Sequence, residues 1–245
     1  MKNVTRIFKN DFVNYFKYRI IHMIFILSIV LGIAMGIFTN IDPLVFVYIT
    51  IFIFPVITFA VSFYIEREDD TILPNESCEF CPFQLVIGKI MSAISIQLLP
   101  LLIYTIIMKL VLNMNFSLIL FILVFILSSI IHVLIGLSLA IIAKSNLVMS
   151  LSYIVYILVF SVLPFLSLAQ AIPSNMEYFL IISPAFLSGV LFENIVFGYL
   201  FSDLLLVILA VSLQFVYLFL LIYFVVRPFF KKYLTLVLIQ EGHHD

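Results

Sequence analysis

The sequence predicts an all-α integral membrane protein with six transmembrane helices. Of its 245 residues, 65% are apolar and only 10% are charged. Soluble domains carry about 45–50% apolar and about 25% charged residues. Six apolar runs are also long enough to cross a bilayer as helices, which takes about 20 residues each. The composition therefore excludes a soluble enzyme, a nucleic-acid-binding domain and a disordered chain.

The first 19 residues predict an amphipathic helix that lies in the membrane interface. Five basic residues accompany a single acid, and apolar side chains recur every three or four positions from Val4 to Phe16. A basic helix with an aromatic stripe lies on a membrane rather than across it. The alternative is a basic flank that only sets orientation. The segment lacks the pattern of a cleavable signal peptide, so we expect the first span to remain as an anchor.

Six spans are expected at about 20–38, 44–65, 85–112, 116–143, 147–169 and 203–226. Together they form one predicted transmembrane domain over 20–232. A further apolar stretch at about 178–201 is interrupted by Ser183-Pro184, Gly189 and Glu193. We therefore expect 170–202 to be a re-entrant segment on the outer side, between the fifth and sixth spans, because non-helical backbone at membrane depth needs protein or water around it.

The distribution of Lys and Arg predicts that both termini are cytoplasmic. With six spans, eleven of the twelve basic residues fall on the cytoplasmic side and only Lys109 falls outside, near a helix end where it can snorkel. A seventh span would move Arg227, Lys231 and Lys232 outside. The same topology makes 66–84 a cytoplasmic loop and 233–245 a cytoplasmic tail.

No catalytic or metal-binding pattern occurs in the sequence. Gly88-Lys89 lacks both the earlier glycine and the following hydroxyl of a phosphate-binding loop. No H-E-x-x-H or G-x-S-x-G motif occurs. Cys78 and Cys81 form C-x-x-C without a second ligand pair, which is weak support for zinc, and their role stays open. We expect a protein that is not an enzyme, binds no cofactor or metal itself and takes energy from a partner.

Polar and small residues within the spans are few. Gln97, His132 and Gln214 are candidates for the polar side chains of a translocation path, or they are polar groups satisfied inside the bundle. Ser28, Gly32 and Gly36 are spaced by four and predict close helix packing, either within the chain or between two copies. The near absence of charge within the spans argues against an ion-coupled secondary transporter.

The predicted cytoplasmic loop is dense in acidic residues. Six of the thirteen Asp and Glu residues lie between 66 and 79. The loop is either a solvated turn or a docking element for a cytosolic partner. Its sequence runs from Glu66-Arg67-Glu68 through Thr71 to Pro82-Phe83, and then to Gly88-Lys89 before the third span.

This loop resembles that of the permease subunits of ABC-2-type transporters, the type V exporter group. The resemblance extends over nearly the whole chain in the order of its elements: a basic "elbow" helix, six spans and a re-entrant outer segment. It is similar to the small permeases linked to drug or antibiotic export. Two departures are Cys81 before the proline, where the family has a small or polar residue, and the unusually acidic loop.

The resemblance implies an exporter in which each of two permease chains, identical or paralogous, binds one cytosolic ABC ATPase subunit. That partner would bind ATP and Mg²⁺, and the assembly would sit in a bacterial-type plasma membrane. The implied substrate is hydrophobic or amphipathic: a drug, an antimicrobial peptide or a lipid-linked molecule. The alternatives are a secondary transporter and a membrane assembly protein without a transport role. The implied ATPase-coupling residues are Glu66, Arg67, Glu68, Asp70, Thr71, Pro82, Phe83 and Lys89.

Overall fold

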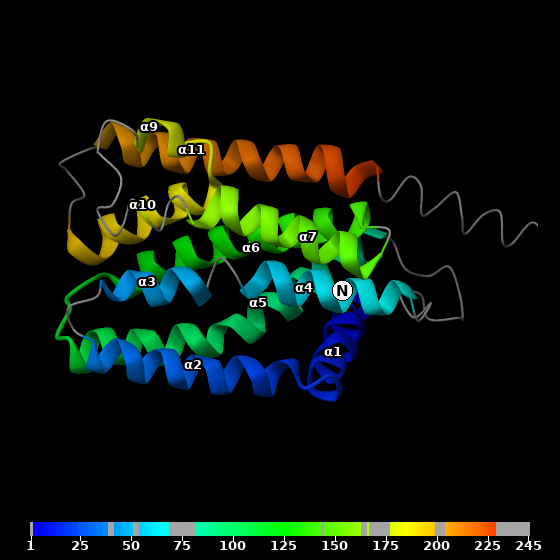
Figure 1. Ribbon diagram of the computed structural model, residues 1–245, viewed down its shortest axis with the longest axis horizontal. Helices are drawn as coiled ribbons and strands as arrows, with labels where there is room; N and C mark the ends of the chain where they lie inside the picture. The colour runs from blue at the N-terminus through cyan, green and yellow to red at the C-terminus, as the bar shows by residue number, and fades with distance from the viewer. Residues whose placement is uncertain are drawn as a thin grey trace, which may run out of the picture.

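The computed structural model is mostly helical in the part of the chain that it describes (Figure 1). It describes residues 2–38, 42–50, 54–68, 82–143, 145–162, 166, 177–198 and 204–228. No strand occurs within these ranges. The predicted all-α class is therefore confirmed for the described residues.

Within the described residues, four helices are long and apolar enough to cross a membrane. They are α2 (Ile20–Ile37), α5 (Pro82–Ile106) continued by the π-helical η2 (Ile107–Val111), α6 (Leu118–Ile142), and α11 (Leu204–Leu221) continued by η5 (Ile222–Val226). The expected span 147–169 corresponds to a shorter apolar helix, α7 (Asn146–Tyr156) with η3 (Ile157–Val162).

The expected span 44–65 corresponds to two described helices, α3 (Pro43–Tyr48) and α4 (Phe54–Glu68), and residues 51–53 between them lie outside the described ranges. α3 is capped by Asp42, whose carboxylate accepts a hydrogen bond from the Leu44 amide at 2.8 Å. Pro55 stands at the second position of α4, where its missing N–H group costs no helical hydrogen bond.

The long helices lie side by side, and α6 is the most enclosed of them. Of the most apolar stretch of α6, 44% is buried, against 11% for α11 at the edge of the bundle. α4 packs closely on α6: a Cβ added to Gly136 would lie 2.8 Å from the carbonyl oxygen of Val56. α1 (Lys2–Lys17) crosses the ends of α2 and α5 at a steep angle (Figure 1).

Two of the four hydrophobic core clusters of the described residues follow one another along α6. The first core cluster contains Phe121 and Phe125 of α6 with Leu101, Tyr104 and Met108 of the α5–η2 helix. The second core cluster contains residues of α4, α5, α6 and α7. They include Phe59, Ala93, Val133, Leu134, Leu137 and Met149.

A short helical hairpin packs against α11. α9 (Glu177–Leu180) is followed by α10 (Pro184–Phe197), which Ser183 caps by accepting a hydrogen bond from the Phe186 amide at 3.2 Å. Ser183 also donates to the carbonyl of Phe160 at 2.6 Å, and Tyr217 donates to the carbonyl of Ile182. With 14 residues, α10 is about 21 Å long, which is shorter than a bilayer core of about 30 Å.

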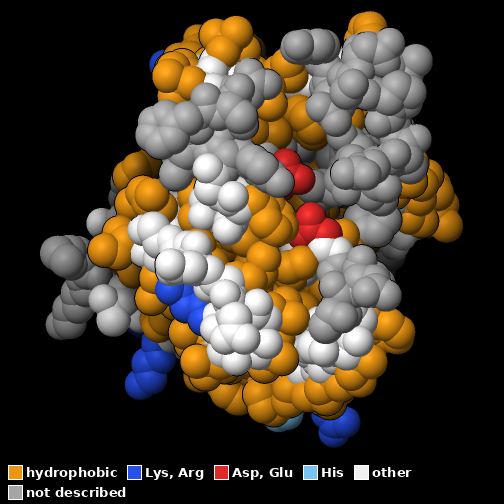
Figure 2. Space-filling view, turned by 90° about the vertical axis from the view of Figure 1, so that its left-hand side faces the viewer, with side chains coloured by type: hydrophobic (Ala, Val, Ile, Leu, Met, Phe, Trp, Pro, Cys, Tyr) orange, Lys and Arg blue, Asp and Glu red, His pale blue; other side chains and the backbone are white. Residues whose placement is uncertain are grey.

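One end of the bundle is formed by the start of α3, the end of α10 and the start of α11. Figure 2 shows this end covered mainly by apolar side chains, with acidic side chains near its centre. Two described acidic residues, Asp42 and Glu193, belong to elements that meet at this end.

Candidate functional site

A buried ion pair joins α1 to the first turns of α5, at the end of the bundle where the acidic loop begins. Lys89 Nζ lies 3.1 Å from Asp11 Oδ1, and Ser92 Oγ donates to Asp11 Oδ2 at 3.1 Å. Asp11 is 5% exposed and Lys89 is 4% exposed. Removing one partner of such a pair leaves an uncompensated buried charge, which is strongly destabilising. The pair therefore ties the two helices together.

The pattern of α1 explains how Asp11 reaches this position. Ile7, Asp11 and Tyr15 are spaced by four, so they lie on one helix face, and all three are buried. Gly88 allows that face to approach α5 closely. A Cβ added there would lie 2.7 Å from Ile7 Cγ2 and 3.3 Å from the Val4 carbonyl oxygen.

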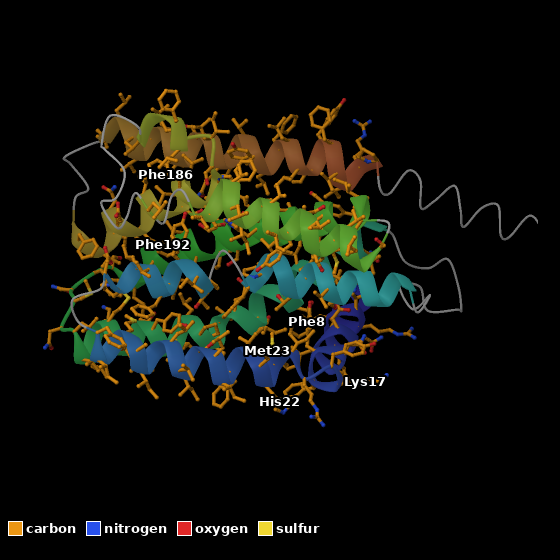
Figure 3. All side chains as sticks on the ribbon, in the orientation of Figure 1. Phe8, Lys17, His22, Met23, Phe186 and Phe192 are labelled. Carbon is orange, nitrogen blue, oxygen red and sulfur yellow. The ribbon has the colours of Figure 1, made fainter. Side chains whose placement is uncertain are left out.

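The neighbouring face of α1 is aromatic. The Phe8 and Phe12 rings stack at 5.9 Å between centroids, and Phe12 meets Phe16 edge-on at 5.5 Å. Phe16 in turn lies 5.9 Å from the ring of His22 in α2. Lys17 and His22 are exposed near the α1–α2 corner, as Figure 3 shows. An aromatic surface edged by exposed basic side chains is typical of helices in a membrane interface.

Those of the predicted ATPase-coupling residues that the structure describes lie at this same end of the bundle. Glu66, Arg67 and Glu68 form the end of α4, and Pro82 is the first residue of α5. Phe83 follows it and is 57% exposed. Asp70, Thr71, Cys78 and Cys81 lie outside the described residues.

Lys89 was grouped with the loop residues by sequence, but the structure places it inside the bundle. It lies two turns into α5, where its ammonium group binds Asp11. Its contact is therefore with α1 of its own chain.

The predicted packing residues contact other helices to different degrees. Ser28 is buried and donates to the carbonyl of Ile24 at 2.5 Å. A Cβ added to Gly32 would lie 2.9 Å from Ile107 Cδ1, so this glycine serves the contact between α2 and the α5–η2 helix. A Cβ added to Gly36 would meet no atom within 4 Å. Close packing within the chain therefore accounts for Gly32.

The three predicted polar side chains of the translocation path are all buried, but they do not form one cluster of bonded groups. His132 Nδ1 bonds with the Ser128 carbonyl oxygen at 2.7 Å. Gln214 Nε2 donates to Ser188 Oγ at 2.8 Å, which links α11 to α10. Gln97 lies on α5 and is 3% exposed.

Sequence reasoning missed the roles of Asp11, Ser92 and Gly88. The available signal was that Asp11, the only acid of the first 19 residues, falls within the apolar stripe of the helix rather than on its polar face. It also missed the hydrogen bond between Thr50 Oγ1 and Tyr104 Oη at 2.8 Å, for which a continuous apolar run gives no signal. Among the described residues, no group of three or more His, Cys, Asp or Glu side chains could hold a metal ion.

Comparison of the chain with protein-family models, with curated proteins and with solved structures gave no match. The functional interpretation therefore depends on the residues and geometry of the chain itself.

Proposed function

We propose that this chain is the permease subunit of an ATP-driven exporter of the ABC-2 type, which moves a hydrophobic or amphipathic substrate out of the cell. One observation carries the proposal most directly. An acidic loop joins α4 to α5, and α5 is bound at its first turns to a basic amphipathic helix by the Asp11–Lys89 pair. A loop that docks on a partner and is anchored in this way can transmit force to the bundle.

The proposed topology has six spans and cytoplasmic termini in a bacterial-type plasma membrane. α1 is the elbow helix in the interface, and the α9–α10 hairpin is the re-entrant outer segment. Support comes from the steep crossing of α1, from the basic residues at one end, and from the length of α10, about 21 Å. α3 and α4 together would form the second span, and α7 with η3 would form the fifth.

In the proposed mechanism the loop is a coupling element. The carboxylates of Glu66, Glu68 and Asp70 would meet a basic groove on the ATPase, because complementary charge steers and orients such contacts. Arg67 would pair with an acidic group at its edge, and Thr71, Pro82 and Phe83 would shape the turn that enters α5. The ATPase subunit, present in two copies beside two permease chains, would bind ATP and Mg²⁺ and supply the energy.

The proposed substrate class follows from the spans. Their side chains are aliphatic and aromatic with almost no fixed charge, so they offer apolar walls to a passing molecule. A drug, an antimicrobial peptide or a lipid-linked molecule has this character.

The test uses the full chain in nanodiscs with a candidate ABC ATPase subunit from the same genome. Glu66→Ala with Glu68→Ala is compared with the wild type and with Glu241→Ala plus Asp245→Ala, which removes two acids from the predicted cytoplasmic tail. We expect the loop variant to bind the ATPase about tenfold more weakly, corresponding to about 1.4 kcal/mol. The tail variant should bind as the wild type does.

Transport of ethidium by proteoliposomes separates the alternatives. ATP-dependent export that is lost in the loop variant supports the proposal. Movement driven by an ion gradient without ATP indicates a secondary transporter. If the ATPase does not bind and neither energy source drives movement, the permease proposal is wrong and a membrane assembly protein becomes the better interpretation.

A further inference from the structure

The most buried face of α5 contains one polar side chain that has no hydrogen-bond partner in the described part of the chain. Ala93, Gln97, Leu101 and Tyr104 follow one another at intervals of three or four, and none is more than 4% exposed. The Tyr104 hydroxyl bonds with Thr50. Neither the oxygen nor the nitrogen of the Gln97 amide has a partner among the described residues.

α6, which packs against α5, also contains buried polar side chains without a hydrogen-bond partner among the described residues. Ser128 and Ser129 are 0% exposed, and neither hydroxyl has a hydrogen-bond partner in the described part of the chain. His132, one turn further along, is also fully buried and bonds with the Ser128 carbonyl oxygen.

The polar groups of α5 and α6 that have no described partner lie between the same two apolar clusters. Ala93 shares the second core cluster with Val133, and Leu101 shares the first core cluster with Phe125. The two helices are in contact and run in opposite directions (Figure 1). Gln97 lies midway along α5 between Ala93 and Leu101, and Ser129 lies midway along α6 between Phe125 and Val133, with Ser128 beside it. The name polar layer is used below for Gln97, Ser128 and Ser129.

The hydrogen-bond donors and acceptors of the polar layer determine which class of ligand it can bind. A glutamine amide offers two donors and one acceptor, and each serine hydroxyl both donates and accepts. Buried polar groups are nearly always hydrogen-bonded, and each unpaired one costs about 1–3 kcal/mol. Neither 90–108 nor α6 contains Lys, Arg, Asp or Glu. The unused hydrogen-bonding capacity of these three buried groups therefore fits an uncharged polar ligand.

We propose that Gln97, Ser128 and Ser129 form a binding site inside the bundle for an uncharged group that both donates and accepts hydrogen bonds. Water and the hydroxyl or amide part of an amphipathic molecule share this chemistry. The site does not depend on the permease function. If the chain is a permease, the amphipathic molecule is its cargo.

Thiol labelling of the full chain in nanodiscs tests the site. In a background with Cys78→Ser and Cys81→Ser, single cysteines are placed at the polar layer (Gln97→Cys, Ser129→Cys) and one turn away on the same buried face (Ala93→Cys, Leu101→Cys). Two reagents are used: methyl methanethiosulfonate and a glucose-bearing methanethiosulfonate. Thiolates react and thiols in apolar surroundings do not, so we expect the polar-layer cysteines to react about tenfold faster than the controls.

The two reagents distinguish the sources of the ligand chemistry. Rapid reaction with the small reagent alone assigns the site to water, and reaction with both shows that it also admits a hydroxyl-bearing group. Equal rates at all four positions with both reagents would overturn the proposal. Ser129→Cys replaces one oxygen by sulfur and keeps the side-chain shape, so it stays informative if Gln97→Cys fails to fold. Labelling needs neither ATP nor a partner, so its failure leaves the proposed export function standing.

Discussion

The α1–α5 junction and the polar layer both bury polar side chains in an apolar bundle, but they satisfy them differently. At the junction, the Asp11 carboxylate forms an ion pair with the Lys89 ammonium group and accepts a hydrogen bond from the Ser92 hydroxyl. In the polar layer, the described part of the chain offers no partner to the Gln97 amide. The difference teaches that burial alone does not identify a binding site. A buried polar group that is hydrogen-bonded within the chain holds helices together. A buried polar group without such a bond is able to bind a ligand.

The largest expected effect is a loss of unfolding free energy on substitution at the α1–α5 junction. Lys89→Met leaves the Asp11 carboxylate buried without its cation and should lower the unfolding free energy by about 3–5 kcal/mol. Asp11→Leu together with Lys89→Met removes both charges and should recover most of that loss. Steric-trap unfolding in bicelles measures both. Equal losses in the single and the double variant would show that the pair is not what joins the helices.

A smaller effect should follow from forcing the junction apart without removing charge. In Gly88→Ala the new Cβ would lie 2.9 Å from Ile7 Cβ, so α1 must shift, at a cost of about 1–3 kcal/mol. Gly36→Ala is the matched control, because a Cβ there meets nothing within 4 Å. The same unfolding measurement should show no loss of stability for the control. A Gly88→Ala protein as stable as the wild type would mean that the contact yields easily.

The smallest expected effect belongs to the polar layer. Gln97→Met keeps the length of the side chain and removes an amide that has no described partner, so the unfolding free energy should change by less than about 1 kcal/mol. The same substitution should slow methyl methanethiosulfonate labelling of Ser129→Cys. A loss as large as that of Lys89→Met would place Gln97 among the structural groups and remove the contrast between the two regions.

Much of the helical arrangement could be predicted because apolar runs end sharply at polar residues. The runs expected at 20–38 and 116–143 correspond to α2 (Ile20–Ile37) and α6 (Leu118–Ile142). The helix bounds within 44–65 could not be predicted, because apolar residues follow one another across 49–54 with only Thr50 among them. Apolar character indicates burial in lipid or in protein, but it does not indicate the bounds of a helix.

The candidate site was less predictable, because its contacts join distant parts of the chain. Lys89 stands beside the acidic loop in sequence, which favoured a role there, yet its partner Asp11 lies 78 positions earlier. Gln97 was predictable as a polar residue inside a span. Its position relative to Ser128 and Ser129 depends on how α5 packs against α6. The spacing of residues along a single helix carries no information about that packing.

The separation of Asp11 and Lys89 has a consequence for how the protein is made. Ribosomes add about 5–20 residues per second, so the 78 residues between the partners take about 4 to 16 s to synthesise. α1 therefore emerges from the ribosome that much earlier than Lys89, and until Lys89 follows, the Asp11 carboxylate lacks this partner. The pair therefore cannot guide insertion of the first span and closes only once α5 has emerged. It acts as a late assembly step, after which α1 is fixed in place.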